Sequence, residues 1–257
     1  MAQRRRGQTI ARKNEDDIRR IRDAGVIIAR IFDAIAGASL EGVSTLEVDS
    51  LVEDLIMKSH SRPAFKTVVG YDHATCISVN EEVVHGIPSK KKVLRKGDIL
   101  KVDIGVVKKG YFADACRTFT IDPISEDAAK LVSVTRQSLE EAITEMYPGK
   151  RLGDIGARIQ EYAEWNGFSV VREFTGHGVG FALHEHPNVP HYGIRGSGKF
   201  LEPGMVLAVE PMLNQGGYDV ITLKDGWTTV TEDGKLSAQF EDTIAITEHG
   251  PQILTRE

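Results

Sequence analysis

Four acidic residues stand in segments whose composition is otherwise typical of β-strands. They are Asp103, Asp114, Glu210 and Glu241. Acids are depleted in strands, and a buried carboxylate without a partner costs several kcal/mol. For any one of these residues, an edge strand that turns the side chain to solvent is a sufficient explanation. If all four converge, their repulsion requires positive charge, and two divalent cations would balance four carboxylates in formal charge.

His177 lies between two glycines in the segment Thr-Gly-His-Gly-Val-Gly. Glycine on both sides lets the backbone approach closely and orients the ring, and imidazole is the commonest neutral ligand of transition metals. Carboxylates with one imidazole suit Mn, Fe, Co or Zn in a hydrolytic pair of metal ions. Cys116 is the one cysteine beside these residues, so a zinc site built from thiolates is not expected.

Two further histidines have no evident structural reason. His85 lies in Val-Val-His-Gly-Ile-Pro, and His184 lies in Ala-Leu-His-Glu-His-Pro. Either of them alone is more simply a hydrogen-bonded loop residue, so the residues themselves leave a chemical and a structural role open. The remaining histidines are given no role: His60, His73, His186, His191 and His249.

The elements that must position these residues occur in the same order twice. Helical spacing and N-cap residues predict helices at about 14–36, 44–59, 125–146 and 152–165. After the first pair comes a hairpin at 98–120, turning at Lys108-Lys109-Gly110. After the second pair come strands at 168–171, 205–213, 219–223, 227–231 and 239–247, and a glycine-rich loop at 175–180. We expect an α+β fold of two structurally alike halves, about 14–120 and 125–250, with helices packed on a curved antiparallel sheet. Active sites favour the seam between such halves.

Composition narrows the classes of protein. With 257 residues, 41% hydrophobic and 27% charged, the chain is ordinary for a soluble globular protein, and its net charge of −5 argues against a uniformly basic nucleic-acid-binding surface. Two cysteines do not make a disulfide framework, which favours a reducing compartment, the cytoplasm by default. Residues 1–13 hold five basic residues and no acid. We expect a flexible basic tail at 1–13, either solvated or in contact with ribosomal phosphates, ahead of a single domain at 14–257.

The spacing of the acids and His177 has a counterpart in a known family. Asp114 follows Asp103 by eleven residues, and His177 lies in Gly-His-Gly-Val-Gly. Glu210 precedes a proline, and Glu241 lies in Gln-Phe-Glu-Asp-Thr. With Val-His-Gly-Ile-Pro and Leu-His-Glu-His-Pro, these motifs resemble the type I methionine aminopeptidases of the pita-bread fold, over roughly residues 15 to 254.

The resemblance implies two divalent metal ions, cobalt, manganese, iron or zinc, with a hydroxide held between them. Asp103 would chelate one ion, and Asp114 and Glu241 would bridge both. His177 and Glu210 would complete the other ion, and Glu210 would also handle the proton of the attacking hydroxide. The implied reaction is removal of the initiator methionine from nascent polypeptides whose second residue is small.

The same resemblance assigns the remaining site residues. His184 would steady the developing oxyanion, and His85 would contact the scissile amide nitrogen or the leaving group. The residues matching substrate-binding positions are His85, His184, Tyr71, Cys76, Leu183 and Trp227. A methionine pocket built from them needs an apolar, sulfur-compatible lining.

Other positions concern a second cation and departures from the family pattern. Asn80 and Ser237 match positions whose backbone carbonyls hold a monovalent cation in relatives. Gly105 and Cys116 stand where hydroxyl residues that tune the carboxylates are common, and Leu183 replaces a frequent aromatic residue. These departures put the metal affinity and the pocket shape in question, but not the reaction.

Two other functions stay open. One is an Xaa-Pro dipeptidase-like hydrolase, because prolidase and aminopeptidase P share the fold, although they usually carry a large extra N-terminal domain. The other is a non-catalytic pita-bread binding module, against which the presence of all five proposed ligands argues. We expect a cytoplasmic monomer that meets nascent polypeptides and the ribosome, with no membrane partner and no sequence-specific nucleic acid.

Overall fold

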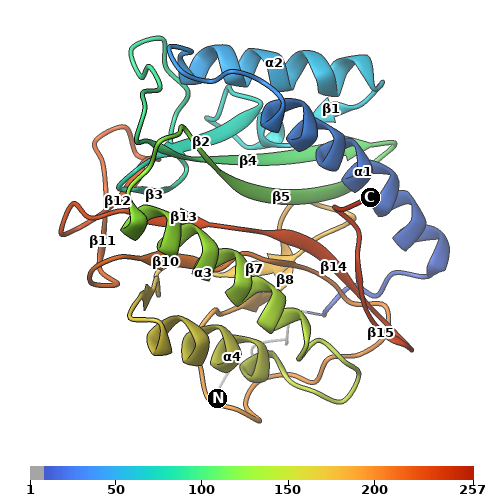
Figure 1. Ribbon diagram of the computed structural model, residues 1–257. Helices are drawn as coiled ribbons and strands as arrows, with labels where there is room; N and C mark the ends of the chain where they lie inside the picture. Colours follow the sequence, from blue (N-terminus) through green and yellow to red (C-terminus); the bar gives the residue numbers. More distant parts are fainter. Residues whose placement is uncertain (1–8) are drawn as a thin grey trace, which may run out of the picture.

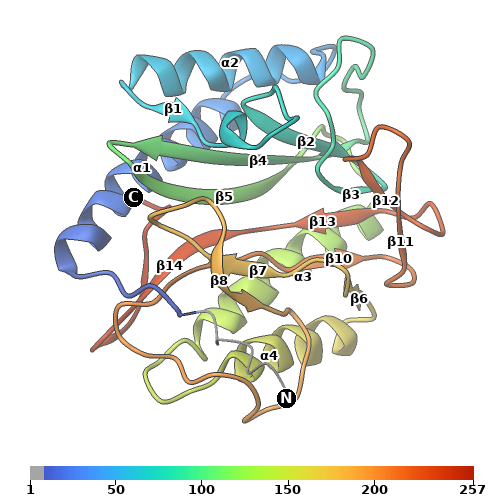
Figure 2. The same cartoon turned by 180° about the vertical axis from the view of Figure 1, so that it is seen from behind.

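Helices form two outer pairs, with the strands between them. The structure, a computed structural model, describes residues 9–257, so the basic residues at 4–6 of the expected tail lie outside the described residues. The first pair is α1 (Glu15–Ala36) and α2 (Thr45–Lys58), and the second is α3 (Glu126–Ile143) and α4 (Leu152–Trp165). Figure 1 shows the first pair at the top and the second at the bottom. Figure 2 shows the same arrangement from behind, in agreement with the expected α+β class.

Capping residues fix where the first two helices begin. The Asn14 side chain accepts a hydrogen bond from the backbone N–H of Asp17, whose carboxylate accepts from the N–H of Asn14. Ser44 and Glu47 form the same reciprocal cap at the start of α2. The apolar stripe of α1 around Ile28 is buried in the core of the first half.

The first half contains one antiparallel sheet, in the order β1–β4–β2 with β5 on β4. Its strands are β1 (Arg62–Pro63), β2 (Thr75–Val79), β4 (Ile99–Lys108) and β5 (Tyr111–Thr120). A short 3-10 helix, η1 (Phe65–Thr67), follows β1. β4 and β5 form the expected hairpin, whose turn residues Lys109 and Gly110 both have positive φ. Leu100 and Ile104 enter the core beneath α1, whereas Ile99 on the other face joins the core of the second half.

The second half contains two antiparallel sheets, and a third sheet joins the halves. The sheets are β15–β14–β9–β7–β8, β13–β10–β6 and β11–β12–β3. Their strands are β3 (Glu82–Val84), β6 (Ser169–Val170), β7 (Gly176–Gly178), β8 (Glu185–Val189), β9 (Val206–Val209), β10 (Met212–Asn214), β11 (Val220–Thr222), β12 (Thr229–Thr231), β13 (Ser237–Gln239), β14 (Asp242–Thr247) and β15 (Gly250–Ile253). Because β3 belongs to the first half, its pairing with β12 ties the halves together.

Two expected strands are each broken in two. The expected strand at 205–213 divides at Glu210 and Pro211 into β9 and β10, which pair in different sheets. Proline has no N–H for the ladder, which is why pairing stops there. The expected strand at 239–247 divides at Phe240 and Glu241 into β13 and β14. Both glutamates therefore lie at corners between sheets rather than within continuous strands.

Two further expectations were wrong in detail. The expected glycine-rich loop at 175–180 contains β7, which lies between β8 and β9. Glycine is required there because a Cβ on Gly176 would lie 2.3 Å from the Ala208 carbonyl oxygen, and one on Gly178 would lie 2.4 Å from that of His186. α3 ends at Ile143 rather than near residue 146, because the chain turns before Pro148.

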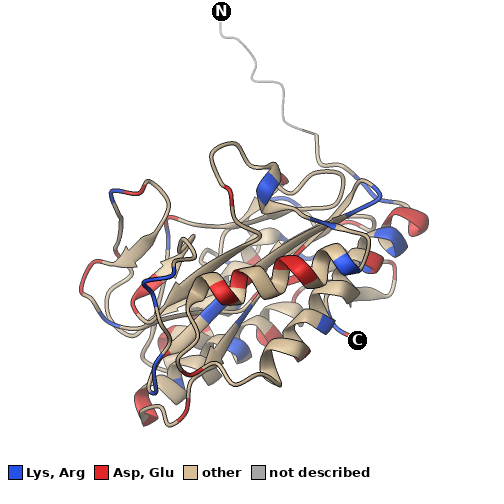
Figure 3. Ribbon diagram, turned by 90° about the horizontal axis from the view of Figure 1, so that it is seen from above, with Lys and Arg blue, Asp and Glu red and all other residues tan. Residues whose placement is uncertain are grey.

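The end of the expected tail belongs to the folded domain. Lys13 is 4% exposed, and its backbone N–H donates to the carbonyl of Gly204. Its ammonium lies 2.5 Å from the carboxylate of Glu185. The folded domain therefore includes Lys13, whereas we expected it to begin at residue 14. Figure 3 shows acidic and basic residues interspersed along the helices. Within residues 9–257, no helix combines the length and apolar character needed to cross a membrane.

Candidate metal centre and adjoining cavity

All five predicted ligands line one cavity of about 490 Å³. They come from separate elements of both halves: Asp103 from β4, Asp114 from β5, His177 from β7, and Glu210 and Glu241 from the corners after β9 and β13. These residues are far apart in the sequence, and they meet at the seam between the two halves. The four carboxyl groups do not point to separate surfaces.

The hairpin sets the first two carboxylates side by side. Asp103 is opposite Cys116, and Gly105 is opposite Asp114, so the two acids are diagonal neighbours on one face. Cys116 also accepts a hydrogen bond at its carbonyl from the N–H of Glu241, at 2.9 Å. This contact holds the Glu241 corner of the second half against the hairpin of the first half.

Backbone and side-chain contacts hold the two glutamates. The N–H of Glu210 donates to Nε2 of His191 at 3.1 Å, and Nε2 of Gln239 donates to Oε2 of Glu210 at 3.2 Å. Neither His191 nor Gln239 stands out in the sequence, and His191 had been given no role. Of these two residues, only Gln239 could have been linked to the site from the sequence, because it lies two residues before Glu241 in the Gln-Phe-Glu-Asp-Thr motif.

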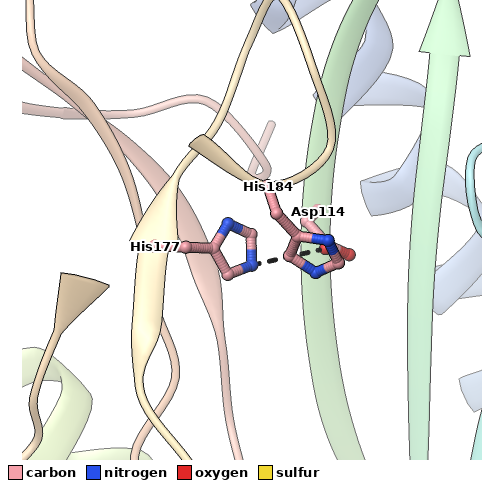
Figure 4. A group of neighbouring side chains, drawn as sticks. All are labelled: Asp114, His177 and His184. Carbon is pink, nitrogen blue, oxygen red and sulfur yellow. Dashed lines mark ion pairs between the residues drawn. The ribbon is translucent and has the colours of Figure 1, made fainter. Parts of the chain in front are cut away.

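His177 presents one ring nitrogen to the acids. Its Nδ1 lies 2.9 Å from the carbonyl oxygen of Gly178, which sets Nδ1 as the donor and leaves Nε2 with a free lone pair. Nε2 lies 3.7 Å from Oε1 of Glu210 and 3.9 Å from Oδ2 of Asp114, the second pair being drawn in Figure 4. Burial lowers the pKa of His177 to about 4, so the ring is neutral near pH 7, as a metal ligand must be.

The carboxyl groups carry uncompensated charge. Burial, followed by repulsion from Asp114, raises the pKa of Asp103, Glu210 and Glu241 well above the ordinary range. Burial raises the pKa of Asp114 to about 7. In residues 9–257, hydrogen-bond partners are missing for Oδ1 of Asp103, Oδ1 of Asp114 and Oε1 of Glu241. Buried, unpartnered acceptors of this kind mark a place for cations.

The donor atoms fit divalent metal ions. Three groups have their donor atoms within 4.8 Å of one another: Asp103, Asp114 and Glu241; His177, Glu210 and Glu241; and Asp114, His177 and His184. Asp114, His177 and Glu241 each belong to two of these groups, so the groups overlap in one continuous cluster. A set of carboxylates with imidazole is suited to Mn, Fe, Co or Zn. The third group adds His184, which the family pattern placed with the oxyanion.

The two other candidate histidines line the same cavity as the acids. The ring of His184 is 4.5 Å from that of His177, centroid to centroid, and stands at 70° to it (Figure 4). His85 lines the same cavity and packs edge-on against Phe174 at 5.3 Å. Burial lowers the pKa of both, to about 4 for His85. Both rings are therefore neutral near pH 7 and can donate a hydrogen bond.

One part of the cavity lining is apolar. Tyr71, Cys76 and Trp227 line it, and the rings of Tyr71 and Trp227 are 5.0 Å apart. Leu183 is not among the lining residues and packs in the cluster behind them. Sequence reasoning missed Phe65 on η1, which lines the cavity. Glycine at position 105 accommodates this segment, because a Cβ there would lie 2.9 Å from the Cβ of Ala64 and 3.0 Å from the Phe65 ring.

The expected monovalent cation does not fit this chain. Nζ of Lys101 lies 2.7 Å from the carbonyl oxygen of Asn80 and 2.8 Å from that of Ser237. The two carbonyls that would hold the ion are therefore already bound by an ammonium group. Lys101 is 1% exposed.

Comparison with known proteins identifies the family and agrees with the fold. The family model for metallopeptidase family M24 matches residues 19–248. A methionine aminopeptidase of Clostridium acetobutylicum is 48% identical, over 95% of this chain and 97% of its own. Methionine aminopeptidase 1 of Bacillus subtilis is 49% identical, over 92% of this chain and 95% of its own.

Solved structures of other proteins have the same fold as this chain. The methionine aminopeptidase of Thermotoga maritima has a TM-score of 0.95 at 45% identity, covering 97% of this chain and 100% of that one. A prolidase of Pyrococcus furiosus has a TM-score of 0.78 at 24% identity, a likeness of fold alone, and the match covers 65% of its length. The chain belongs to metallopeptidase family M24 and, within it, to the methionine aminopeptidases.

Proposed function

We propose that this chain is a metal-dependent aminopeptidase that removes the N-terminal methionine from polypeptides whose second residue is small. The observation that carries the proposal is the junction, in one cavity, of a cluster of buried acids and His177 with an apolar pocket. The pocket has the lining that a thioether side chain favours, with the rings of Tyr71 and Trp227 and the thiol of Cys76.

The metal ligands in this proposal are Asp103, Asp114, His177, Glu210 and Glu241. Two divalent ions held there, cobalt, manganese, iron or zinc, would polarise the scissile carbonyl and lower the pKa of water to near neutrality. The unpartnered carboxyl oxygens and the raised pKa values support this occupancy, because cations remove the repulsion that burial makes severe.

The protein's own residues then handle protons and orientation. The carboxylate of Glu210, which lines the cavity, is the general base that takes the proton from the attacking water and returns it to the leaving amine. Gln239 orients this carboxyl by donating to Oε2. His184 donates a hydrogen bond to the developing oxyanion, and His85 contacts the scissile amide, since both rings are neutral.

Substrate choice follows from the pocket. Methionine fills the apolar part, where Trp227 and Tyr71 pack edge to face, while the peptide bond lies beside His85. Leu183 acts from behind the lining by supporting Cys76 and Tyr71.

The experiment that tests the function is a peptide assay after reconstitution with manganese or cobalt. Met-Ala-Ser should release methionine, Met-Leu-Ser should be cleaved much more slowly, and Ala-Pro should not be cleaved. A chain that cleaves only the proline peptide is an Xaa-Pro dipeptidase instead, and a chain that cleaves none with any metal is a binding module. Asp103→Asn should abolish release, which ties turnover to the cavity.

The proposal includes a cellular setting, a cytoplasmic monomer acting on nascent chains. Both cysteines, Cys76 and Cys116, are unpaired and buried, as in proteins of reducing compartments. Contact between residues 1–8 and ribosomal phosphates is tested by co-sedimentation of the full chain and of a chain lacking these residues. Equal sedimentation of the two would remove the ribosomal role.

A further inference from the structure

Lys101 is a charged side chain buried at the seam between the halves. Its ammonium donates to the carbonyl of Asn80, in the turn between β2 and β3, and to the carbonyl of Ser237, at the start of β13. Across residues 9–257, no carboxylate oxygen lies within 4.0 Å of Nζ, so the group has no ion-pair partner. A lysine is almost never fully buried unless its charge is paired, so this one needs an explanation.

The Lys101 environment is that of a small coordinated cation. Backbone carbonyl oxygens are hard donors that suit compact positive charges, and the ammonium is such a charge on a flexible stem. The two carbonyls come from opposite halves of the molecule and face the same point. Removal of the ammonium would take a donor from the buried Ser237 carbonyl and from the half-buried Asn80 carbonyl, although Asn80 also accepts from the N–H of Ser237.

The contact with Ser237 reaches the acid cluster through β13. Ser237 begins this strand, and Gln239 at its end donates to Glu210. Glu241 follows two residues later at the corner. On the other side, the amide of Asn80 is fixed by Asp98 and Ile99, and its backbone has a φ of 53°. The Asn80 side of this contact is therefore fixed by hydrogen bonds. The Ser237 side is connected through β13 to two of the acids, Glu210 and Glu241.

We propose that the Lys101 ammonium is a tethered monovalent cation that joins the two halves and positions β13, and with it Glu241 and Gln239. A covalently attached cation makes a free sodium or potassium ion unnecessary at this point. Lys101 is in this account a positioning residue, which acts through Glu241 and Gln239 without touching substrate. Its effect on metal affinity rests on the proposed function, whereas its effect on the metal-free fold does not.

The test uses Lys101→Ala and Lys101→Met, with Lys96→Met as the matched control at the surface. Thermal midpoints of the metal-free proteins are measured at pH 6.5 and constant ionic strength in sodium, potassium, propylammonium or tetramethylammonium chloride, with 1-propanol as the neutral analogue of propylammonium. Manganese affinity is measured by calorimetry in the same solutions. Propylammonium supplies the atoms that Lys101→Ala removes, and tetramethylammonium is too large to enter.

The wild-type midpoint should be the same in every chloride salt. Both Lys101 variants should melt roughly 5 to 10 °C lower, the loss expected when buried carbonyls lose a donor in a chain of this size, and should bind manganese about tenfold more weakly. Sodium, potassium or propylammonium should restore much of both properties in Lys101→Ala, but tetramethylammonium and propanol should not. Lys101→Met, in which the stem still fills the space, should respond to none of them.

Four results would overturn the inference in whole or in part. A wild-type midpoint raised by sodium or potassium relative to tetramethylammonium would show that a free ion is still needed. Wild-type stability and manganese affinity in Lys101→Met would show that the charge is dispensable. Failure of every small cation to restore Lys101→Ala would reduce Lys101 to a packing residue. Lower stability of the Lys101 variants with unchanged manganese affinity would disprove the proposed effect of Lys101 on Glu241, while leaving the proposed peptidase activity intact.

Discussion

The backbone N–H of Glu210 donates a hydrogen bond to Nε2 of His191, 3.1 Å away. His191 is completely buried, and burial lowers its pKa to about 3, so the ring is neutral and remains an acceptor at any working pH. The proton must then lie on Nδ1, which has no partner among residues 9–257. A buried orphan donor costs about 1–3 kcal/mol. This cost is consistent with a role for His191 in fixing the corner that carries Glu210.

Replacing His191 should therefore act through Glu210. His191→Leu leaves the Glu210 N–H without an acceptor, and we expect kcat and manganese affinity to fall about tenfold or more, with little change in KM. His191→Gln keeps an acceptor oxygen and should retain most of both. The measurements are peptide kinetics and calorimetric metal titration. Equal activity in the leucine and glutamine variants would show that the hydrogen bond is unimportant.

Lys13 should control the loop that carries His184. Its ammonium pairs with Glu185, whose other carboxyl oxygen accepts from the N–H groups of Phe181 and Ala182 at 2.6 and 2.9 Å. Lys13→Met leaves this largely buried carboxylate without its cation, which should cost about 3 kcal/mol of unfolding free energy. We also expect kcat/KM to fall. Both effects are measured by denaturant unfolding and peptide kinetics.

Arg12→Met is the matched control for Lys13. Arg12 pairs with Glu202 at the surface, where both side chains are about half exposed, so its loss should change the unfolding free energy by no more than about 0.5 kcal/mol. If the two variants were equally stable and active, the contact between Lys13 and Glu185 would have no role in holding the loop.

The metal-free protein should become less stable as the pH rises from about 6.5 to 8. The folded-state pKa values of Asp103, Glu210 and Glu241 are raised, and that of Asp114 is about 7, so the folded state keeps protons that the unfolded state has released. Stability from such groups is present at low pH and is lost as the pH passes the folded pKa. Below about 6.5 the buried histidines, with lowered pKa values, act in the opposite direction.

The pH effect is measured as the thermal midpoint of the metal-free protein at pH 6.5 and pH 8. We expect a fall of several degrees, reduced in Glu241→Gln, which removes one of the carboxyl groups. The pKa of Lys101 is lowered to about 7, so this one group favours the folded state as the pH rises and offsets part of the expected fall. Saturating manganese should reverse the slope, because protons compete with metal for the carboxylates. A flat profile with and without metal would argue against uncompensated acids.

Trp227→Ala should weaken methionine binding more than chemistry. The indole lines the apolar part of the cavity and packs on Tyr71, so we expect KM to rise roughly tenfold with a smaller change in kcat. Trp165→Ala, at the end of α4, removes an indole that is 90% exposed and should change neither constant. An unchanged KM in Trp227→Ala would place the methionine side chain elsewhere.

Sequence periodicity was sufficient for the elements with strong local signals. Asn14 and Ser44 mark the starts of α1 and α2, and Lys109-Gly110 marks the hairpin turn. It failed at the two corners, because Glu210 and Glu241 stand in apolar runs that look like continuous strands. The chain changes sheets at these residues through long-range pairing, which no local pattern records.

The composition of the acid cluster was also predictable, because four carboxylates in apolar strands cannot be explained separately. His191 and Lys101 were not predictable. His191 resembles any loop histidine until the corner at Glu210 is placed against it. Lys101 resembles an exposed strand lysine until Asn80 and Ser237 meet from opposite halves. Both roles arise from contacts between distant segments.

Calorimetric titration of the metal-free chain with manganese tests the central claim most directly. The cluster of Asp103, Asp114, His177, Glu210 and Glu241 should bind two ions per chain, with methionine release from Met-Ala-Ser appearing as the sites fill. Glu241→Gln, which alters a residue shared by two of the ligand groups, should bind no more than one ion tightly and release no methionine. A wild-type chain that binds no ion at this cluster, or that binds two and releases no methionine, would contradict the account.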